Sequence, residues 1–185
     1  MTRRNELLHQ KPRVLLHACC GPCATSVIEQ LHNDYDLTLY FFNPNIKPID
    51  EYYRRLCEAE RVANYFGVPI LAGDYDTKSF DNAVASYADY PEGSERCAVC
   101  FNLRLGDTAR KSADDNFDLF ATTLTISPHK NSAVINRTAE ETGVLHGAKP
   151  LLGDFKKKDG FKRSTELSRE LGLYRQKYCG CRPTV

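Results

Sequence analysis

The stretch RVLLHACCGPC, residues 13–23, decides the fold. Its first six residues, 13–18, form a short apolar run that ends at the cysteines, which predicts a buried first strand. Pro22 suits the first turn of a helix, and we expect that helix to run from Pro22 to Leu31. The stretch thus predicts a strand, then a turn that carries thiols, then a helix.

Strands and helices are predicted to alternate along the rest of the chain. Further strands are expected over residues 37–42, 68–72 and 117–124, with a short extended piece over 149–152. Helices are expected over residues 49–66, 131–142 and 163–171, with two more between 77 and 110 and with Ser127-Pro128 as a helix start. This alternation predicts one α/β domain over residues 1–185, a mostly parallel sheet with helices on both faces.

Three segments that carry thiol or polar side chains follow predicted strands. The first cysteines follow strand one, Asn43 to Asn45 follow strand two, and Thr125 to Lys130 follow strand four. In open parallel sheets, ligands bind beyond the carboxyl ends of the strands, where the strand order reverses. We therefore expect these three segments to face one crevice.

The bulk composition excludes several classes of protein. The chain has 185 residues, 42% hydrophobic and 26% charged, which suits a globular domain with a sizeable core. It contains no apolar run of about 18 residues, the length that a membrane helix needs. MTRRNELLHQKPR at the N-terminus has no apolar stretch after its basic residues, so we expect no secretory signal and a cytoplasmic location. The net charge of +1 alone says nothing about nucleic acid.

Cysteine is the most informative residue type. Of eight cysteines, seven fall in three tight groups: Cys19, Cys20 and Cys23; Cys97 and Cys100; Cys179 and Cys181. Cys57 stands alone in a predicted helix, where we expect a packed thiol rather than a ligand. In a reducing compartment, clustered thiols bind metal or perform redox chemistry more often than they form disulfides.

Three kinds of thiol site fit this spacing. Cys20-Gly21-Pro22-Cys23 has the spacing of a thioredoxin dithiol, and a helix start lowers thiol pKa values. However, the chain has no Trp before the motif, and a dithiol leaves five clustered cysteines unexplained. A structural zinc site needs four ligands, three fewer than the seven available. An iron–sulfur cluster uses thiolates almost exclusively. A cluster, a zinc site and a dithiol therefore remain as alternatives at this point.

Longer motifs resemble one family. They are HACCGPC (17–23), FFNPNIKPIDEYYRR (41–55), ERCAVCFNLRL (95–105), FATTLTISPHKN (120–131) and DFKKKDGFKRSTELSRELGLYRQKYCGC (154–181). Together they resemble the QueH family of cobalamin-independent epoxyqueuosine reductases, in order and over nearly the whole chain. The resemblance implies an oxidoreductase that converts epoxyqueuosine to queuosine at the wobble position of tRNA, the last step of queuosine biosynthesis.

The resemblance also implies a fold and cofactors. The family resembles the nucleotide-loop ATP pyrophosphatases, which have a Rossmann-like (HUP) fold with a phosphate-binding loop after strand one. CCGPC occupies that place, so we expect no ATP. The family is expected to carry a [4Fe–4S] cluster and, beside it, a second metal ion, expected to be iron, in place of cobalamin. The seven clustered cysteines are enough thiolates for both, and an external electron donor is required.

The remaining candidates concern proton transfer and the tRNA. His17, Tyr52 and His129 are the catalytic candidates. Arg104 is expected to pair with the negative charge of the thiolates. The candidates for substrate binding are Asn43, Asn45, Arg55, Lys156, Lys157, Lys158, Lys162, Arg163, Arg175 and Gln176. Basic residues interleaved with Phe155 and Phe161 suit an unpaired tRNA loop, although such a run is ordinarily a solvated face. The alternatives in function are a zinc-stabilised RNA-binding module without catalysis and a CxxC dithiol oxidoreductase.

Overall fold

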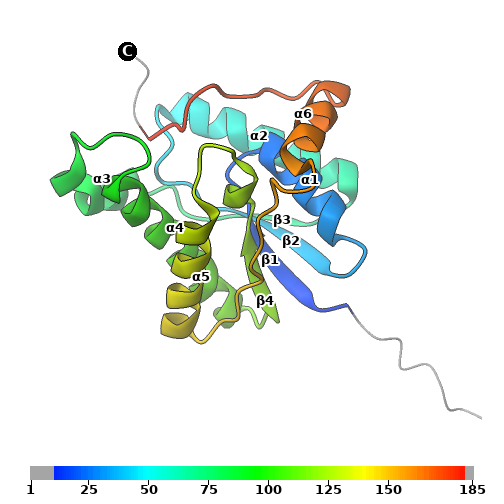
Figure 1. Ribbon diagram of the computed structural model, residues 1–185, viewed down its shortest axis with the longest axis horizontal. Helices are drawn as coiled ribbons and strands as arrows, with labels where there is room; N and C mark the ends of the chain where they lie inside the picture. The colour runs from blue at the N-terminus through cyan, green and yellow to red at the C-terminus, as the bar shows by residue number, and fades with distance from the viewer. Residues whose placement is uncertain (1–10, 182–185) are drawn as a thin grey trace, which may run out of the picture.

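A parallel sheet lies at the centre of the computed structural model, which describes residues 11–181 (Figure 1). Its strands are β1 (Arg13–His17), β2 (Asp36–Phe41), β3 (Ile70–Ala72) and β4 (Leu119–Thr122), in the order β3-β2-β1-β4. All neighbouring strands are parallel, and Leu16 pairs with Leu39 on one side and with Ala121 on the other. The strand order reverses at β1, so the carboxyl end of β1 is where a ligand site is expected.

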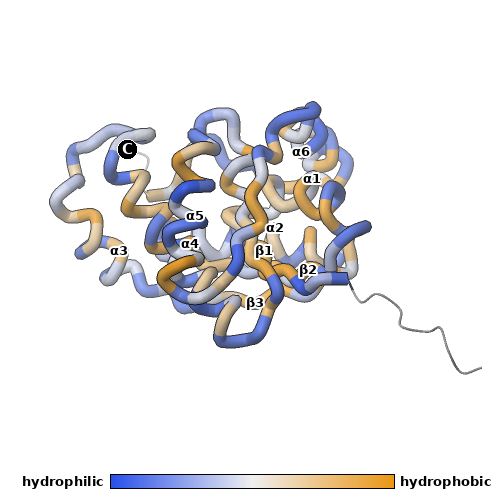
Figure 2. The backbone as a smooth tube through the Cα atoms, turned by 60° about the horizontal axis from the view of Figure 1, so that its bottom comes forward, coloured by the Kyte–Doolittle hydropathy of each residue, from blue (hydrophilic) through white to orange (hydrophobic). Residues whose placement is uncertain are grey.

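Helices cover both faces of the sheet because β1 is apolar on both faces. Val14 and Leu16 pack towards α1 (Gly21–Leu31) and α2 (Ile49–Phe66), and α6 (Gly160–Glu170) packs on α1. Leu15 packs on the other face, against α4 (Glu95–Asp114) and α5 (Ser132–His146). The short helix α3 (Thr77–Val84) contacts α4. Figure 2 shows hydrophobic colouring along β1 and β2 and hydrophilic colouring in the outer loops. The Rossmann-like arrangement predicted from the sequence is thus confirmed.

Most predicted elements are present, with corrections at their ends. The helix expected over 49–66 has those bounds in α2, because Gly67 ends it in the left-handed conformation, with φ 65°. Ser127-Pro128 does not start a helix, so that prediction is wrong. A 3₁₀ turn, Thr123–Ile126, follows β4, and α5 begins only at Ser132, because the Asn131 side chain accepts hydrogen bonds from the backbone of Ala133 and Val134.

Two further predictions concern residues at the surface or outside the described range. Cys57 is exposed on α2, so the expectation of a packed thiol is wrong. Residues 1–10, on which the expectation about a secretory signal rests, lie outside the described residues. No helix among residues 11–181 has both the length and the apolar character that crossing a membrane requires.

Gly21 explains why CCGPC contains a glycine. Helix α1 begins at Gly21 directly against α2, and a Cβ atom built on Gly21 would lie 2.4 Å from the carbonyl oxygen of Glu58. Backbone atoms cannot move aside as a flexible side chain can, so only glycine allows this close crossing. The crossing holds Cys20 and Cys23, on either side of Gly21, against the body of the protein.

The Gly21→Ala variant is expected to be less stable than the wild type by about 1–3 kcal/mol, because an extra methyl group overpacks the helix crossing. The free energy of unfolding in urea measures this effect. Gly106→Ala in α4 is the matched control, since its Cβ would meet nothing closer than 3.8 Å. That control should gain about 0.5–1 kcal/mol, as an alanine normally does in a helix. Equal stabilities for the two variants would contradict the account of the crossing.

Candidate metal centre

Cys19, Cys20 and Cys23, the first thiol group, lie at the carboxyl end of β1 and the start of α1. Their Sγ atoms all lie within 4.8 Å of one another, and those of Cys19 and Cys20 are 3.9 Å apart. All three are free thiols. Cys20 precedes the first residue of α1 in an extended conformation, with no side-chain cap at the helix start. The positive end of the helix dipole therefore favours a thiolate here.

Neighbouring groups favour the anion of one thiol in the first group. Hydrogen bonds from the thiols of Cys20 and Cys23 lower the pKa of Cys19 well below its usual value, and the charges of Arg104 and Lys130 lower it further. The same hydrogen bond with Cys19 raises the pKa of Cys20 to about 12. The Thr123 hydroxyl donates to Cys19 Sγ over 3.6 Å. Cys19 is thus the thiol of this group whose anion its surroundings favour.

The remaining clustered cysteines form a second thiol group: Cys97, Cys100, Cys179 and Cys181. Two come from the start of α4 and two from the chain after α6, and all four line a cavity of about 190 Å³. A hydrogen bond from Cys181 lowers the pKa of Cys179 to about 6, whereas burial raises the pKa of Cys100 to about 11. Here too, the surroundings favour the anion of one thiol, Cys179.

The two thiol groups differ in spacing. Among residues 11–181, only the first group brings three or more cysteine, histidine or acidic side chains with their ligand atoms within 4.8 Å of one another. The second thiol group is more open and surrounds a cavity. Donor sets made of thiols alone suit zinc and iron–sulfur centres. The residues present therefore fit a compact site beside a larger one.

Arg104 and Lys130 link the two thiol groups electrostatically. Arg104 on α4 is 2% exposed, and its guanidinium donates to Asn43 Oδ1 over 2.5 Å and to Cys100 Sγ over 3.9 Å. The charges of Cys100, Cys19 and Cys179 all act on it. Burial alone would lower the pKa of Lys130, but the nearby thiol groups, Cys179 and Cys19 first, raise it. Two cations thus compensate the negative charge of both groups, and the expected pairing of Arg104 with thiolates has a geometric basis.

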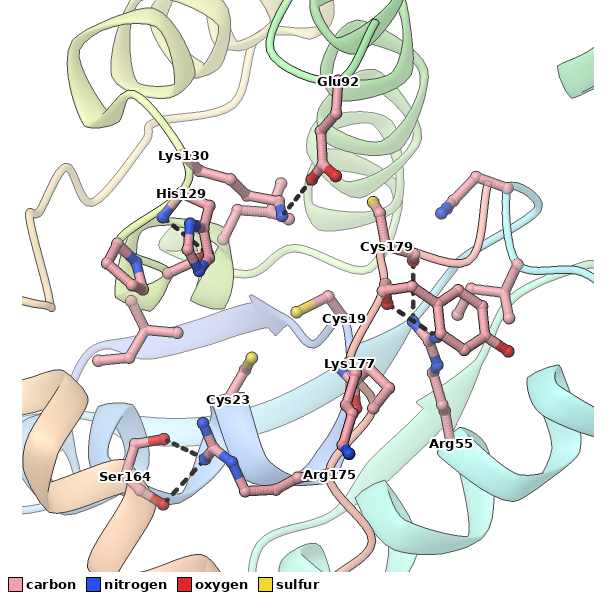
Figure 3. Close-up of a pocket in the computed structure, with 18 of the residues that line it drawn as sticks. Cys19, Cys23, Arg55, Glu92, His129, Lys130, Ser164, Arg175, Lys177 and Cys179 are labelled. Carbon is pink, nitrogen blue, oxygen red and sulfur yellow. Dashed lines mark hydrogen bonds and ion pairs between the residues drawn. The ribbon is translucent and has the colours of Figure 1, made fainter. Parts of the chain in front are cut away.

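A larger cavity of about 410 Å³ opens beside both thiol groups (Figure 3). Cys19 and Cys23 line it from one side, and Cys179, which also lines the smaller cavity, from another. Predicted substrate or catalytic residues that also line it are Asn45, Arg55, His129, Arg175 and Gln176. Figure 3 shows Lys130 directed towards Glu92, and their ion pair spans 3.9 Å. The fold therefore brings the ends of β1, β2 and β4 to one crevice, as the sequence predicts.

Eight predicted catalytic or substrate-binding residues lie outside the lining of this cavity, and three of them, His17, Tyr52 and Asn43, are buried. His17 is fully buried; its Nδ1 contacts the Thr122 hydroxyl at 3.0 Å and its Nε2 the Phe42 carbonyl at 3.2 Å. Burial, with a smaller effect of the Arg104 charge, lowers the pKa of His17 to about 3, so it is neutral. Tyr52 packs in a separate core cluster with Phe41 and Tyr75. Buried Asn43 donates to the carbonyl of Ala18 over 2.9 Å and accepts from Arg104.

The basic segment, residues 156–163 after α5, contains residues that bond the protein and residues that are exposed. Lys156 donates to the carbonyl of Lys130 over 2.9 Å and to the Ser132 hydroxyl over 2.7 Å, so it supports the loop that carries Lys130. Arg163 pairs with Glu29 on α1 over 2.8 Å. Lys157, Lys158 and Lys162 are exposed, and Phe161 lines the larger cavity.

Sequence reasoning missed Lys130, Glu92 and Lys177 as individual members of the site. Lys130 had a usable signal, because it follows His129 in the segment after strand four. No signal in the sequence pointed to Glu92, because it belongs to a loop far along the chain from the first cysteine motif. Asn45 carries a further sign of ligand binding. It is 1% exposed, and its Oδ1, like Gln176 Oε1 and Arg104 Nε, has no hydrogen-bond partner within residues 11–181.

Known proteins resemble the chain in sequence and in fold. The model of the family described as epoxyqueuosine reductase QueH matches residues 14–183. A protein of that name from Streptococcus pyogenes is 42% identical over 177 residues, covering 92% of this chain and 69% of the relative. One from Thermotoga maritima is 36% identical over 171 residues, covering 91% and 88%.

Solved structures show the fold at lower identity. The U34-tRNA thiolase NcsA from Methanococcus maripaludis, with its [4Fe–4S] cluster, superposes with a TM-score of 0.57 at 13% sequence identity. The match covers 91% of this chain and 60% of the thiolase. A predicted tRNA methyltransferase subunit from Methanocaldococcus jannaschii gives 0.57 at 15% identity, covering 86% and 75%. The family match and the two QueH relatives together identify the chain as a member of the QueH family.

Proposed function

We propose that this protein is an epoxyqueuosine reductase, which reduces epoxyqueuosine to queuosine in tRNA. The observation that carries the proposal is the juxtaposition of seven free thiols, in two adjoining groups, with a cavity that both groups line. The reaction takes up two electrons and two protons. Both carbon–oxygen bonds of the epoxide break, a carbon–carbon double bond forms, and the oxygen leaves as water. An electron donor outside the chain supplies the electrons.

The spacing of the thiols supports a division of labour between the groups. A tetrahedral ion with metal–sulfur distances of about 2.3 Å holds its sulfurs about 3.8 Å apart. Cys19, Cys20 and Cys23, all within 4.8 Å of one another, suit one metal ion. The four thiols of the second group match the four ligands that a [4Fe–4S] cluster takes. When bound, the cluster would supply single electrons and the neighbouring ion would supply Lewis acidity.

Residues of the larger cavity would bind the nucleoside and provide protons. Asn45 and Gln176 offer unpartnered carbonyl oxygens, which suit donors such as hydroxyl or amino groups. The Arg175 guanidinium lies 5.6 Å from the centre of the Phe161 ring, an arrangement on which a flipped base could stack. His129 and Lys130 line the same cavity and are the side chains that we propose as proton sources. His17 and Tyr52 take no direct part in this proposal.

Exposed lysines near the cavity are expected to hold the tRNA backbone. Replacing Lys157, Lys158 and Lys162 together with alanine should weaken tRNA binding several-fold and make its dependence on log salt shallower by about 2–3, because three phosphate contacts are lost. Lys156 and Arg163 are kept, since their side chains already support the protein. Binding measured at several salt concentrations gives both quantities.

The control for this prediction removes the same charge elsewhere. Lys78, Lys111 and Arg137 lie on α3, α4 and α5, and their joint replacement with alanine should leave the salt dependence nearly unchanged. If both triple variants lose affinity equally, the attraction is a general effect of net charge, and the basic segment after α5 is only a solvated face.

Expression in a bacterium tests the proposed function. The host should carry out the steps that lead to epoxyqueuosine in tRNA but lack its own epoxyqueuosine reductase, so its tRNA carries the epoxide. Nucleosides from its tRNA should contain queuosine when this protein is expressed and only epoxyqueuosine when it is not. A zinc-binding RNA module would leave the epoxide in place. The Cys20→Ser variant, if it still restored queuosine, would contradict the role of the first thiol group.

A further inference from the structure

The last described residues, 173–181, form a strap without helix or strand that follows α6. The strap carries Cys179 and Cys181 of the second thiol group, and its residues Arg175, Gln176, Lys177 and Tyr178 line the larger cavity. The second thiol group and the larger cavity are therefore complete only when the strap is docked. Because the strap has no ladder or helix of its own, groups from other elements must hold it.

Arg55 on α2 makes the central contacts with the strap. Its Nη1 donates to the carbonyl of Cys179 over 2.8 Å, and its Nη2 donates to the carbonyl of Tyr178 over 3.1 Å. The guanidinium also lies 5.1 Å from the centre of the Tyr178 ring. Arg55 is 3% exposed, so these bonds are shielded from water. A planar group with fixed donors holds two successive carbonyls in one geometry.

Glu51 fixes the orientation of Arg55. Its Oε1 accepts from Arg55 Nε over 2.6 Å, and its carboxylate also accepts from the Tyr174 hydroxyl over 3.1 Å. Glu51 is 5% exposed, so the charge pair is buried. The helix therefore engages the strap at two levels, at Tyr174 through Glu51 and at Tyr178 and Cys179 through Arg55.

Gly180 lets the strap turn over Arg55. It has φ 95°, and a Cβ atom there would lie 3.1 Å from Arg55 Nη1 and Nη2. The backbone N–H of Lys47, just before α2, donates to the Gly180 carbonyl over 2.8 Å. From α4, Arg96 donates to the Cys181 carbonyl over 2.8 Å. Hydrogen bonds from Lys47 and from Arg96 thus hold the strap backbone that places Cys179 and Cys181 near the thiols of α4.

We propose that Arg55, oriented by Glu51, is a positioning residue that clamps the strap and thereby assembles the metal centre and the larger cavity together. The sequence made Arg55 a candidate substrate ligand, and in the structure three of its five N–H groups bond Glu51 and two strap carbonyls. Strap residues line both the larger cavity and the cavity of the second thiol group. Holding the strap in place is therefore expected to affect metal retention and cavity shape together. The part concerning metal rests on the proposed function, whereas strap docking does not.

The test uses the full-length protein with Glu51→Gln and Arg55→Leu combined. Removing both charges leaves no unpaired buried ion, so this variant should fold, whereas a single replacement strands one buried charge. Trypsin cleavage after Arg175 and Lys177 reports strap docking, and chelator titration with the visible spectrum reports metal retention. Arg54→Ala is the matched control, because the neighbouring Arg54 touches the strap only by lying 4.9 Å from the Tyr174 ring centre. Arg55→Lys keeps the charge but not the planar fork.

The double variant should be cleaved at least about tenfold faster than the wild type, because an undocked strap is open to protease. Its metal affinity should fall about 10–100-fold, the usual effect of losing a group that orients metal ligands. Arg55→Lys should be intermediate, and Arg54→Ala should match the wild type. A double variant with wild-type protection and metal affinity overturns the clamp. A wild type without metal but with a protected strap, released in the variant, would refute the proposed function and leave the clamp standing.

Discussion

Cys100→Ser is expected to remove acid-labile sulfide and most of the iron and to abolish reduction, whereas Cys20→Ser is expected to remove one metal ion and leave the sulfide. The difference follows from the spacing of the two thiol groups. Cys20 belongs to the group whose sulfurs lie within 4.8 Å of one another, and Cys100 to the group that surrounds a cavity of about 190 Å³. Only an iron–sulfur cluster contains sulfide. Loss of sulfide in a variant therefore shows that the replaced cysteine belongs to the thiol group that binds the cluster.

Iron and sulfide per chain, measured on anaerobically reconstituted protein, give the result directly. Cys57→Ser is the matched control, since Cys57 is exposed on α2 and belongs to neither group. It should retain the metal content and activity of the wild type. If Cys20→Ser loses the sulfide and Cys100→Ser keeps it, the assignment of the two groups is reversed. Retention of both metal and activity in Cys20→Ser and Cys100→Ser would remove these thiols from the site altogether.

Arg104→Gln is expected to shift the reduction potential of the metal centre by on the order of 100 mV to more negative values and to slow reduction. The guanidinium is buried between the two thiol groups, where the charges of Cys100, Cys19 and Cys179 act on it. A positive charge stabilises the extra electron of a reduced centre by a few kcal/mol at short range, and about 1.4 kcal/mol corresponds to 59 mV for one electron. Removing that charge therefore makes the centre harder to reduce.

A redox titration followed by electron paramagnetic resonance measures the shift. The control is Arg110→Gln on the same helix, because Arg110 is half exposed and pairs with Asp107 and Asp114. Its potential should equal that of the wild type within the error of the titration. Arg104→Gln should also lower the free energy of unfolding by about 1–3 kcal/mol, because the buried Asn43 carbonyl loses a charged donor. A lower stability with an unchanged potential would make Arg104 a structural residue only.

Local sequence patterns predict the elements and the edge of the sheet where the site lies. The apolar run of residues 13–18 and Pro22 correctly give β1 followed by α1, and the helical spacing of apolar residues gives the bounds of α2. The segments after strands one, two and four do meet at one cavity, because parallel strands share a carboxyl edge. Local capping explains the miss at Ser127-Pro128, where Asn131 starts the helix instead.

Contacts between distant segments could not be predicted from sequence. Nothing in the spacing of Cys97 and Cys100 shows that their partners are Cys179 and Cys181, some eighty residues away, because the path of the strap decides it. Arg55 and Asn43 belong to a matching motif, but only the fold shows that Arg55 bonds the strap and that Asn43 bonds Arg104. Residues of one motif can thus act on the protein itself rather than on a ligand.

Direct observation of turnover tests the central claim most sharply. Anaerobically reconstituted protein is mixed with a chemical reductant and tRNA that carries epoxyqueuosine, and the nucleosides are then analysed by mass spectrometry. The account predicts that the epoxide nucleoside loses one oxygen atom and becomes queuosine, and that Cys100→Ser, which lacks the second thiol group's full ligand set, gives no product. Protein that carries iron and sulfide, binds this tRNA and still leaves the epoxide intact would contradict the account.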